Sequence, residues 1–102
     1  MISIEEKGNY AEVVLVGQLE YEKADELVSL SKTKLLRLSA ATIKLDFSRL
    51  NYINSIGIGA IVSVYKILRE KNKKMVILKP QDNVLKVLKL MRIDEVISIE
   101  GE

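Results

Sequence analysis

The sequence contains no cysteine and no histidine among its 102 residues. Without cysteine the chain can form no disulfide, so a secreted, disulfide-stabilised scaffold has no support. Histidine is the commonest metal ligand and the usual acid–base group near neutral pH, so its absence argues against most zinc and hydrolase chemistries. We therefore expect no metal site, no cofactor and no enzymatic activity.

Long apolar runs are also lacking. The longest, such as residues 56–62, are much shorter than the roughly 18 residues that a membrane-spanning helix needs. Glu5, Glu6 and Lys7 follow almost directly after the first methionine, which does not resemble a signal peptide. We therefore predict no membrane span and a cytoplasmic location.

The formal net charge of +2 is too small to indicate a nucleic-acid partner by itself. Lys71, Lys73 and Lys74 lie close together, but no aromatic residue is interleaved with them as in a stacking surface. We interpret this cluster as a solvated turn and expect no direct contact with nucleic acid.

Composition and patterning predict one α/β domain over residues 1–102. Hydrophobic residues make up 48% of the chain and charged residues 29%, which is normal for a globular fold, and no repeat or linker interrupts it. β-Branched runs and short apolar runs predict strands, and apolar residues at 3.6-residue spacing predict helices. The expected strands are Ile2–Lys7, Tyr10–Leu19, Thr42–Phe47, Met75–Leu78 and Val96–Ile99, and the expected helices are Glu22–Leu38, Ile56–Lys71 and Asp82–Met91.

The resulting order is β-β-α-β-α-β-α-β. A hairpin around Gly8 and Asn9 joins the first two strands, and the strand–helix–strand units imply parallel neighbours joined by right-handed crossovers. The predicted fold is therefore a mixed, mostly parallel sheet with helices packed against it.

Ser48–Gly59 is predicted to be the loop and helix start at the carboxyl end of a parallel strand, where ligands and partners commonly bind in such folds. Asn54 or Ser55 is suited to cap the helix, and this structural role alone explains much of the segment. Two glycines, Gly57 and Gly59, fall in the first turn although each costs about 1 kcal/mol relative to alanine within a helix. Close approach by another backbone is the reason that we favour.

Apolar residues also cover more of this helix than a single core-facing stripe requires. A helix that is covered on several sides and a helix with an exposed patch both have this pattern, and only the exposed patch would indicate an interface. The residues are Ile58, Ile61, Val62, Val64, Tyr65, Ile67 and Leu68.

Three segments follow each other in the order typical of STAS domains: GQLEYEKADEL, IKLDFSRLNYINSIGIGAI and KKMVILKPQDNVLKVLKLMRIDEVISI. Over essentially its whole length the chain resembles the bacterial anti-sigma factor antagonists of this family. Such proteins carry a G-x-L-D turn and an F-I-D-S-S-G-L-G loop, and a partner-switching kinase phosphorylates the second serine of the loop. The resemblance implies a regulatory, non-enzymatic domain that binds a protein.

The chain departs from these motifs at three positions. Glu20 replaces the aspartate of the first motif, and Asn54 replaces the aspartate of the second. Ile56 occupies the position of the phosphorylated serine and cannot accept phosphate. The positions that match the family pattern are Gly17, Leu19, Ile53, Ser55, Gly57, Ile58 and Gly59.

The resemblance implies an anti-sigma factor or a GHKL-type serine kinase as the partner. Phosphate adds about two negative charges at pH 7 and thereby releases a partner, and Ile56 cannot carry it. Three readings therefore remain: a constitutively binding antagonist, a domain phosphorylated at Ser55 instead, or a STAS subunit of a transport or stress-signalling assembly. The predicted partner-binding residues are Glu20, Ser48, Asn51, Asn54, Ser55, Ile56, Gly57, Ile58 and Gly59.

Two other function classes stay open. An enzyme would have to use Glu20, Asp46, Ser48, Arg49 or Ser55, and two carboxylates can serve as acid and base when their pKa values differ. Some STAS domains bind purine nucleotides, and a helix N-terminus suits phosphate, but the chain has no P-loop sequence. As an alternative, a purine nucleotide is therefore expected to bind only weakly.

Overall fold

A computed structural model describes residues 2–101 and has the predicted order of elements. The helices are α1 (Tyr21–Thr33), α2 (Ser55–Arg69) and α3 (Asp82–Leu90), with the short 3-10 turns η1 (Leu35–Arg37) and η2 (Ile93–Glu95). The strands are β1 (Ile2–Lys7), β2 (Tyr10–Leu19), β3 (Thr42–Ile53), β4 (Lys74–Leu78) and β5 (Ser98–Glu100).

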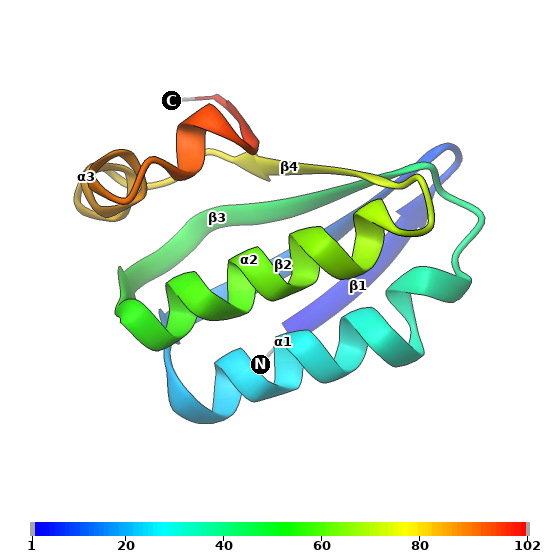
Figure 1. Ribbon diagram of the computed structural model, residues 1–102, viewed down its shortest axis with the longest axis horizontal. Helices are drawn as coiled ribbons and strands as arrows, with labels where there is room; N and C mark the ends of the chain where they lie inside the picture. The colour runs from blue at the N-terminus through cyan, green and yellow to red at the C-terminus, as the bar shows by residue number, and fades with distance from the viewer. Residues whose placement is uncertain (1, 102) are drawn as a thin grey trace.

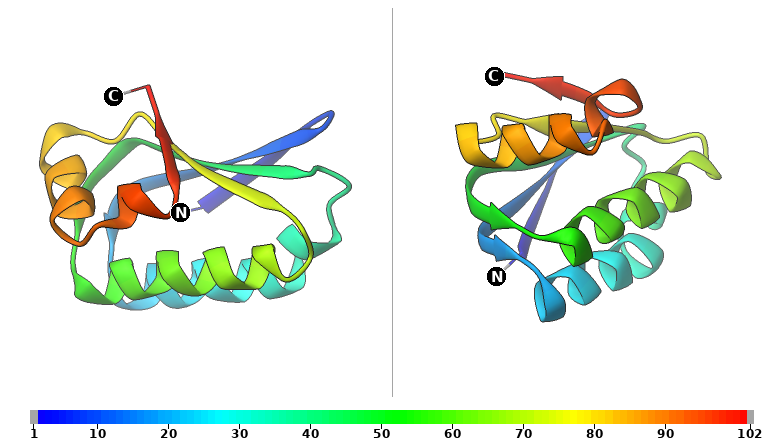
Figure 2. Two further views of the ribbon diagram at one scale, coloured as in Figure 1. Left: turned by 45° about the horizontal axis from the view of Figure 1, so that its top comes forward. Right: turned by 60° about the vertical axis from the view of Figure 1, so that its left-hand side comes forward.

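The strands form one sheet in the order β1-β2-β3-β4-β5, with β1 antiparallel to β2 and all other neighbours parallel (Figure 1). The α/β fold with a mixed, mostly parallel sheet is therefore confirmed. Strand order equals chain order, so crossovers of one hand place successive helices on the same face of the sheet. Figure 2 shows α1 and α2 side by side beneath that face.

The core lies between this face and the two helices. Alternate residues of each central strand point into it, as the pleat requires. The fully buried side chains of this core include Val13, Leu15, Ile43, Leu45 and Phe47 from the sheet and Leu27, Ile61, Val64 and Leu68 from the helices.

Among residues 2–101, no helix combines the length and hydropathy that crossing a bilayer requires.

The other face of the sheet carries polar side chains. Lys7 Nζ lies 2.9 Å from Glu12 Oε1, and these paired charges raise the pKa of Lys7. Lys44 Nζ lies 4.3 Å from the centre of the Tyr10 ring. Residues of β1, β2 and β3 thus contact each other across this face, and α1 and α2 cover only the opposite face.

Strand β3 is longer than predicted: it continues from Phe47 to Ile53, so the expected loop over Ser48–Ile53 is wrong. Its pairing with β2 shifts register twice, between Val14 and Val16 and between Gly17 and Gln18. At the first shift the Ser48 N–H donates to Asp46 Oδ1 at 2.9 Å. Such bulges break the apolar alternation that identifies a strand in a sequence.

Several other boundaries differ from the prediction by one to a few residues. Helix α1 ends at Thr33, and residues up to Arg37 form η1 in place of the expected continuation to Leu38. Helix α2 begins one residue earlier, at Ser55, and ends at Arg69. Strand β5 begins at Ser98, because Ile93–Glu95 form η2 and the Val96 N–H donates to the Ile93 carbonyl.

The lysine cluster after α2 is only partly a solvated turn. Lys73 is half-buried, and its Nζ donates to the carbonyl oxygens of Leu38 and Ala40 at 2.6 and 2.5 Å. These bonds join the α2–β4 turn to the segment before β3. Lys71, in contrast, is exposed.

We expect the substitution Lys73→Met to lower the free energy of unfolding by about 1 to 3 kcal/mol, because it removes two charge-assisted hydrogen bonds. The exposed control Lys71→Met should change it by no more than about 0.5 kcal/mol. Urea unfolding followed by circular dichroism measures both values. Equal effects of the two substitutions would contradict the structural role of Lys73.

Candidate functional site

The candidate site lies where β2 and β3 end and α1 and α2 begin, at one end of the sheet (Figure 1). Leu19, the last residue of β2, pairs with Ile53, the last residue of β3. Helix α1 begins two residues after Leu19, and α2 begins two residues after Ile53. The two helix starts are therefore held next to each other at the carboxyl ends of parallel strands.

Asn54 caps α2. Its backbone is extended, and its Oδ1 accepts a hydrogen bond from the Gly57 N–H at 3.0 Å. The Ile58 N–H donates to the Asn54 carbonyl at 3.0 Å, which completes the first turn. Of the two predicted capping residues, Asn54 is the one that caps the helix, and its amide oxygen accepts as an aspartate oxygen would.

Gly57 is buried against the end of β2. A Cβ atom at this position would lie 2.2 Å from the Leu19 carbonyl oxygen and 2.8 Å from Ile53 Cγ1. The predicted close approach of another backbone is confirmed here, and this backbone belongs to the chain's own strand. Gly59 differs: it is exposed, and a Cβ there would meet nothing within 4 Å.

The turn before α1 is held in an unusual conformation. Tyr21 has φ = +40°, in the left-handed region that tyrosine rarely adopts. Gly17 has φ = +92°, and Lys23 Nζ donates to the Val16 carbonyl beside it. The Glu20 carbonyl accepts the Lys23 N–H at 3.1 Å, whereas its side chain makes no capping hydrogen bond. The half-buried Glu20 carboxylate is thus not used to cap the helix.

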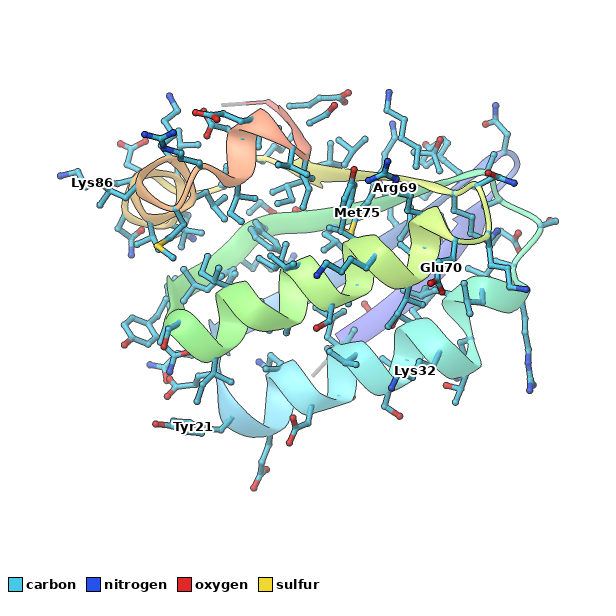
Figure 3. The ribbon with its side chains drawn as sticks, viewed as in Figure 1. Tyr21, Lys32, Arg69, Glu70, Met75 and Lys86 are labelled. Atoms are coloured by element: carbon cyan, nitrogen blue, oxygen red, sulfur yellow. The ribbon has the colours of Figure 1, made fainter. Side chains whose placement is uncertain are left out.

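Several side chains at this end of the molecule are exposed. Tyr21 is 61% exposed, Tyr52 45% and Ile56 41% (Figure 3 shows Tyr21 projecting from the start of α1). We call the surface formed by Glu20, Tyr21, Asn51, Tyr52, Ser55, Ile56 and Gly59 the helix-start surface. Gly57 and Ile58 were also predicted to bind a partner, but both are buried, so they support this surface from beneath.

Sequence reasoning missed the two tyrosines. Their signal was available, because large aromatic residues beside a predicted site are typical of protein interfaces. Tyr52 falls in the segment that the sequence predicts as a loop, and Tyr21 precedes the predicted helix.

Ser48 and Asn51 lie on β3, and their backbones are tied to the start of α3. The Ser48 carbonyl accepts from Gln81 Nε2 at 2.9 Å, and the Asn51 carbonyl accepts from Asn83 Nδ2 at 2.7 Å. Gln81 and Asn83 therefore satisfy carbonyl groups where β3 extends past the end of β4. The Ser48 side chain is exposed but belongs to a different part of β3 from the helix-start surface.

The candidate enzyme residues make no catalytic arrangement that the structure records. Asp46 accepts the Ser48 N–H, which gives it a role in the bulge of β3. Within residues 2–101, no cluster of three or more aspartate or glutamate residues could hold a metal ion. Hollows of about 280, 340 and 480 Å³ are lined by residues from α2 to β5, and none of them includes a predicted site residue.

The model of the STAS domain family matches residues 1–101. The Thermotoga maritima protein TM1081 superposes with a TM-score of 0.87 at 20% identity, covering 96% of this chain and 84% of that one.

Two further solved structures share the fold. The anti-sigma factor antagonist SpoIIAA in its unphosphorylated form has a TM-score of 0.77 at 17% identity, with coverage of 100% of this chain and 89% of that one. A sulfate transporter family protein from Wolinella succinogenes has a TM-score of 0.82 at 12% identity, with coverage of 93% and 80%. The fold therefore occurs in proteins of different kinds.

The two glycines of the first turn of α2 should respond oppositely to alanine. We expect Gly57→Ala to lower the free energy of unfolding by about 1 to 3 kcal/mol, because the new methyl group overlaps the Leu19 carbonyl. Gly59→Ala should raise it by up to about 1 kcal/mol, because alanine favours the helix and the site is open. Thermal unfolding of the two variants measures the difference, and a Gly57→Ala variant as stable as Gly59→Ala would refute the close contact.

Proposed function

Because this chain belongs to the STAS domain family, we propose that it acts as a non-enzymatic antagonist that binds an anti-sigma factor or GHKL-type serine kinase. Binding takes place through the helix-start surface. The similarity to SpoIIAA is a similarity of fold, and the exposed side chains of the helix-start surface support its use as an interface. In this proposal the domain works in the cytoplasm of a bacterium.

Ile56 is the observation that carries the proposal. It is the second residue of α2, is 41% exposed, and stands where the family motif has its phosphorylated serine. An exposed isoleucine at the end of the sheet that also exposes Tyr21 and Tyr52 suits the apolar centre of a protein interface. Because Ile56 cannot be phosphorylated, negative charge cannot be added at this position to release the partner. The antagonist would therefore bind constitutively.

The binding test replaces Ile56 by aspartate, which puts negative charge at the position of the family's phosphoserine. We expect Ile56→Asp to weaken binding of the chain to the GHKL-type kinase of its own organism by at least about tenfold. The matched control is Leu90→Asp on α3, which makes the same change at a side chain that is 75% exposed. Isothermal titration calorimetry measures both affinities, and equal affinities for the two variants would refute the proposed interface.

Phosphorylation at Ser55 is the second candidate for regulation. Ser55 is exposed and is the first residue of α2, where the free N–H groups and the helix dipole favour negative charge. SpoIIAA is known in a phosphorylated form, so the fold accommodates the modification in that protein. A phosphate on Ser55 would lie directly beside Ile56 and add charge to the helix-start surface.

Intact-mass spectrometry after incubation with the kinase and ATP tests this candidate. If Ser55 is modified, the chain gains the mass of one phosphate and the Ser55→Ala variant gains none. Ser63 on the exposed side of α2 provides the control, and Ser63→Ala should be modified like the unaltered chain. An unchanged mass would leave constitutive binding as the proposal.

Other STAS roles are the alternatives. The fold of the Wolinella succinogenes protein makes a subunit of a transport or stress-signalling assembly the next candidate. A purine nucleotide bound at the start of α2 is a further one, because free N–H groups there suit phosphate. Calorimetry with GTP and ATP distinguishes nucleotide binding, since no heat with either nucleotide would reject it.

A further inference from the structure

A second surface lies at the other end of α2, where the helix faces η2 and the start of β5. Two hollows there share Tyr65 and Val96 and therefore adjoin each other. The hollow between α2 and η2 has a volume of about 340 Å³, and the adjoining one, which reaches Lys74 and Ser98, about 280 Å³. We call them together the α2–η2 groove. Figure 3 shows Arg69 and Met75, two of its lining residues, near each other between α2 and β4.

The hollow of about 340 Å³ between α2 and η2 is apolar and open to solvent. Val62, Ile93 and Ile97 line it below, and Met91 and Val96 stand at its rim. Met91 is 54% exposed and Val96 59%, although both are large apolar side chains. Contiguous exposed apolar surface of this kind is typical of binding sites, and methionine adapts readily to different partners.

The charged residues that line the groove are all positive, although η2 itself carries the exposed Asp94 and Glu95 outside this lining. Lys66 and Arg69 come from α2, Arg92 lies on the opposite wall before η2, and Lys74 lies at the far end. Within the part of the chain that the structure describes, no aspartate or glutamate lines either hollow. None of these four cations joins an ion pair within residues 2–101. The fifth, Lys73, already donates to two backbone carbonyls.

The apolar lining and the cations of the groove together indicate which kind of molecule the groove binds. An apolar floor requires apolar side chains, and cations on both walls and along the length of the groove require several negative charges at separate positions. A single-headed amphiphile such as a fatty acid carries one charge and would leave most of these cations unmatched. A polypeptide with acidic and apolar residues in alternation meets both requirements.

We propose that the α2–η2 groove binds an acidic, amphipathic segment of a partner protein. This site is separate from the helix-start surface, since it is built from the middle and last turns of α2 and from η2. It therefore provides a second interaction in addition to the proposed antagonist function. Arg92 and Lys66 contact the carboxylates across the groove, and Val96 and Met91 contact the apolar side chains.

Selection from a phage-displayed library of random short peptides tests the proposal. We expect the selected peptides to be net negative with interspersed apolar residues. Arg92→Glu should weaken their binding by at least about tenfold, because it reverses a charge on the groove wall. The matched control Lys86→Glu reverses an exposed charge on α3 outside the groove and should change the affinity by less than about twofold.

A second variant separates the apolar contribution. Val96→Ser keeps every charge and should also weaken binding, because it removes an exposed apolar contact at the rim. Peptides without acidic enrichment, or with binding that survives both Arg92→Glu and Val96→Ser, would overturn the proposal. Displacement of the peptides by decanoate would also overturn it, because it would indicate a lipid site. Dimerisation of the chain that Val96→Ser abolishes would do the same, because it would indicate a second copy of the chain in the groove.

The two proposals fail independently. Ile56→Asp alters only the helix-start surface and should leave peptide binding unchanged. Loss of peptide binding in Ile56→Asp, with retention in Arg92→Glu, would place the peptides on the helix-start surface and refute the groove. If Ile56→Asp loses kinase binding but keeps peptide binding, the groove proposal stands.

Discussion

The contact of Gly57 with the Leu19 carbonyl is the constraint on which the site depends. Without a side chain at Gly57 the first turn of α2 lies directly on the end of β2, where a Cβ would come within 2.2 Å of the carbonyl oxygen. Because Leu19 also precedes α1, the same contact fixes the starts of both helices relative to each other. The cap that Asn54 provides then orients α2 on this contact through the Gly57 N–H itself.

This arrangement assigns different roles to neighbouring residues of one motif. Gly57 and Ile58 are buried and determine where α2 begins, whereas Ser55, Ile56 and Gly59 face solvent and can contact a partner. One short motif therefore combines buried residues that pack with exposed residues that are accessible to a partner. Ile56 belongs to the exposed set, so in the proposed function the isoleucine changes the binding surface while Gly57 keeps α2 packed on β2.

The order of elements and the sheet type could be predicted because each central strand and helix shows its own hydrophobic period. The extension of β3 to Ile53 could not, because two bulges interrupt the alternation and because Gln81 and Asn83 supply hydrogen bonds from a distant part of the sequence. Sequence reasoning identified both glycines of α2 as unusual, but only the tertiary contact distinguishes Gly57 from Gly59. The left-handed Tyr21 gave no signal in the sequence.

The wide apolar coverage of α2 has a structural explanation at each end of the helix. Ile61, Val64 and Leu68 are buried in the core, Val62 and Tyr65 are half-buried along the groove, and Ile56 is exposed at the helix start. A helix of 15 residues is about 22 Å long, so Ile56 in its first turn and Arg69 in its last turn lie at opposite ends of the helix. The same helix therefore carries the exposed apolar side chain of Ile56 at its start and lines a cationic groove with its middle and last turns.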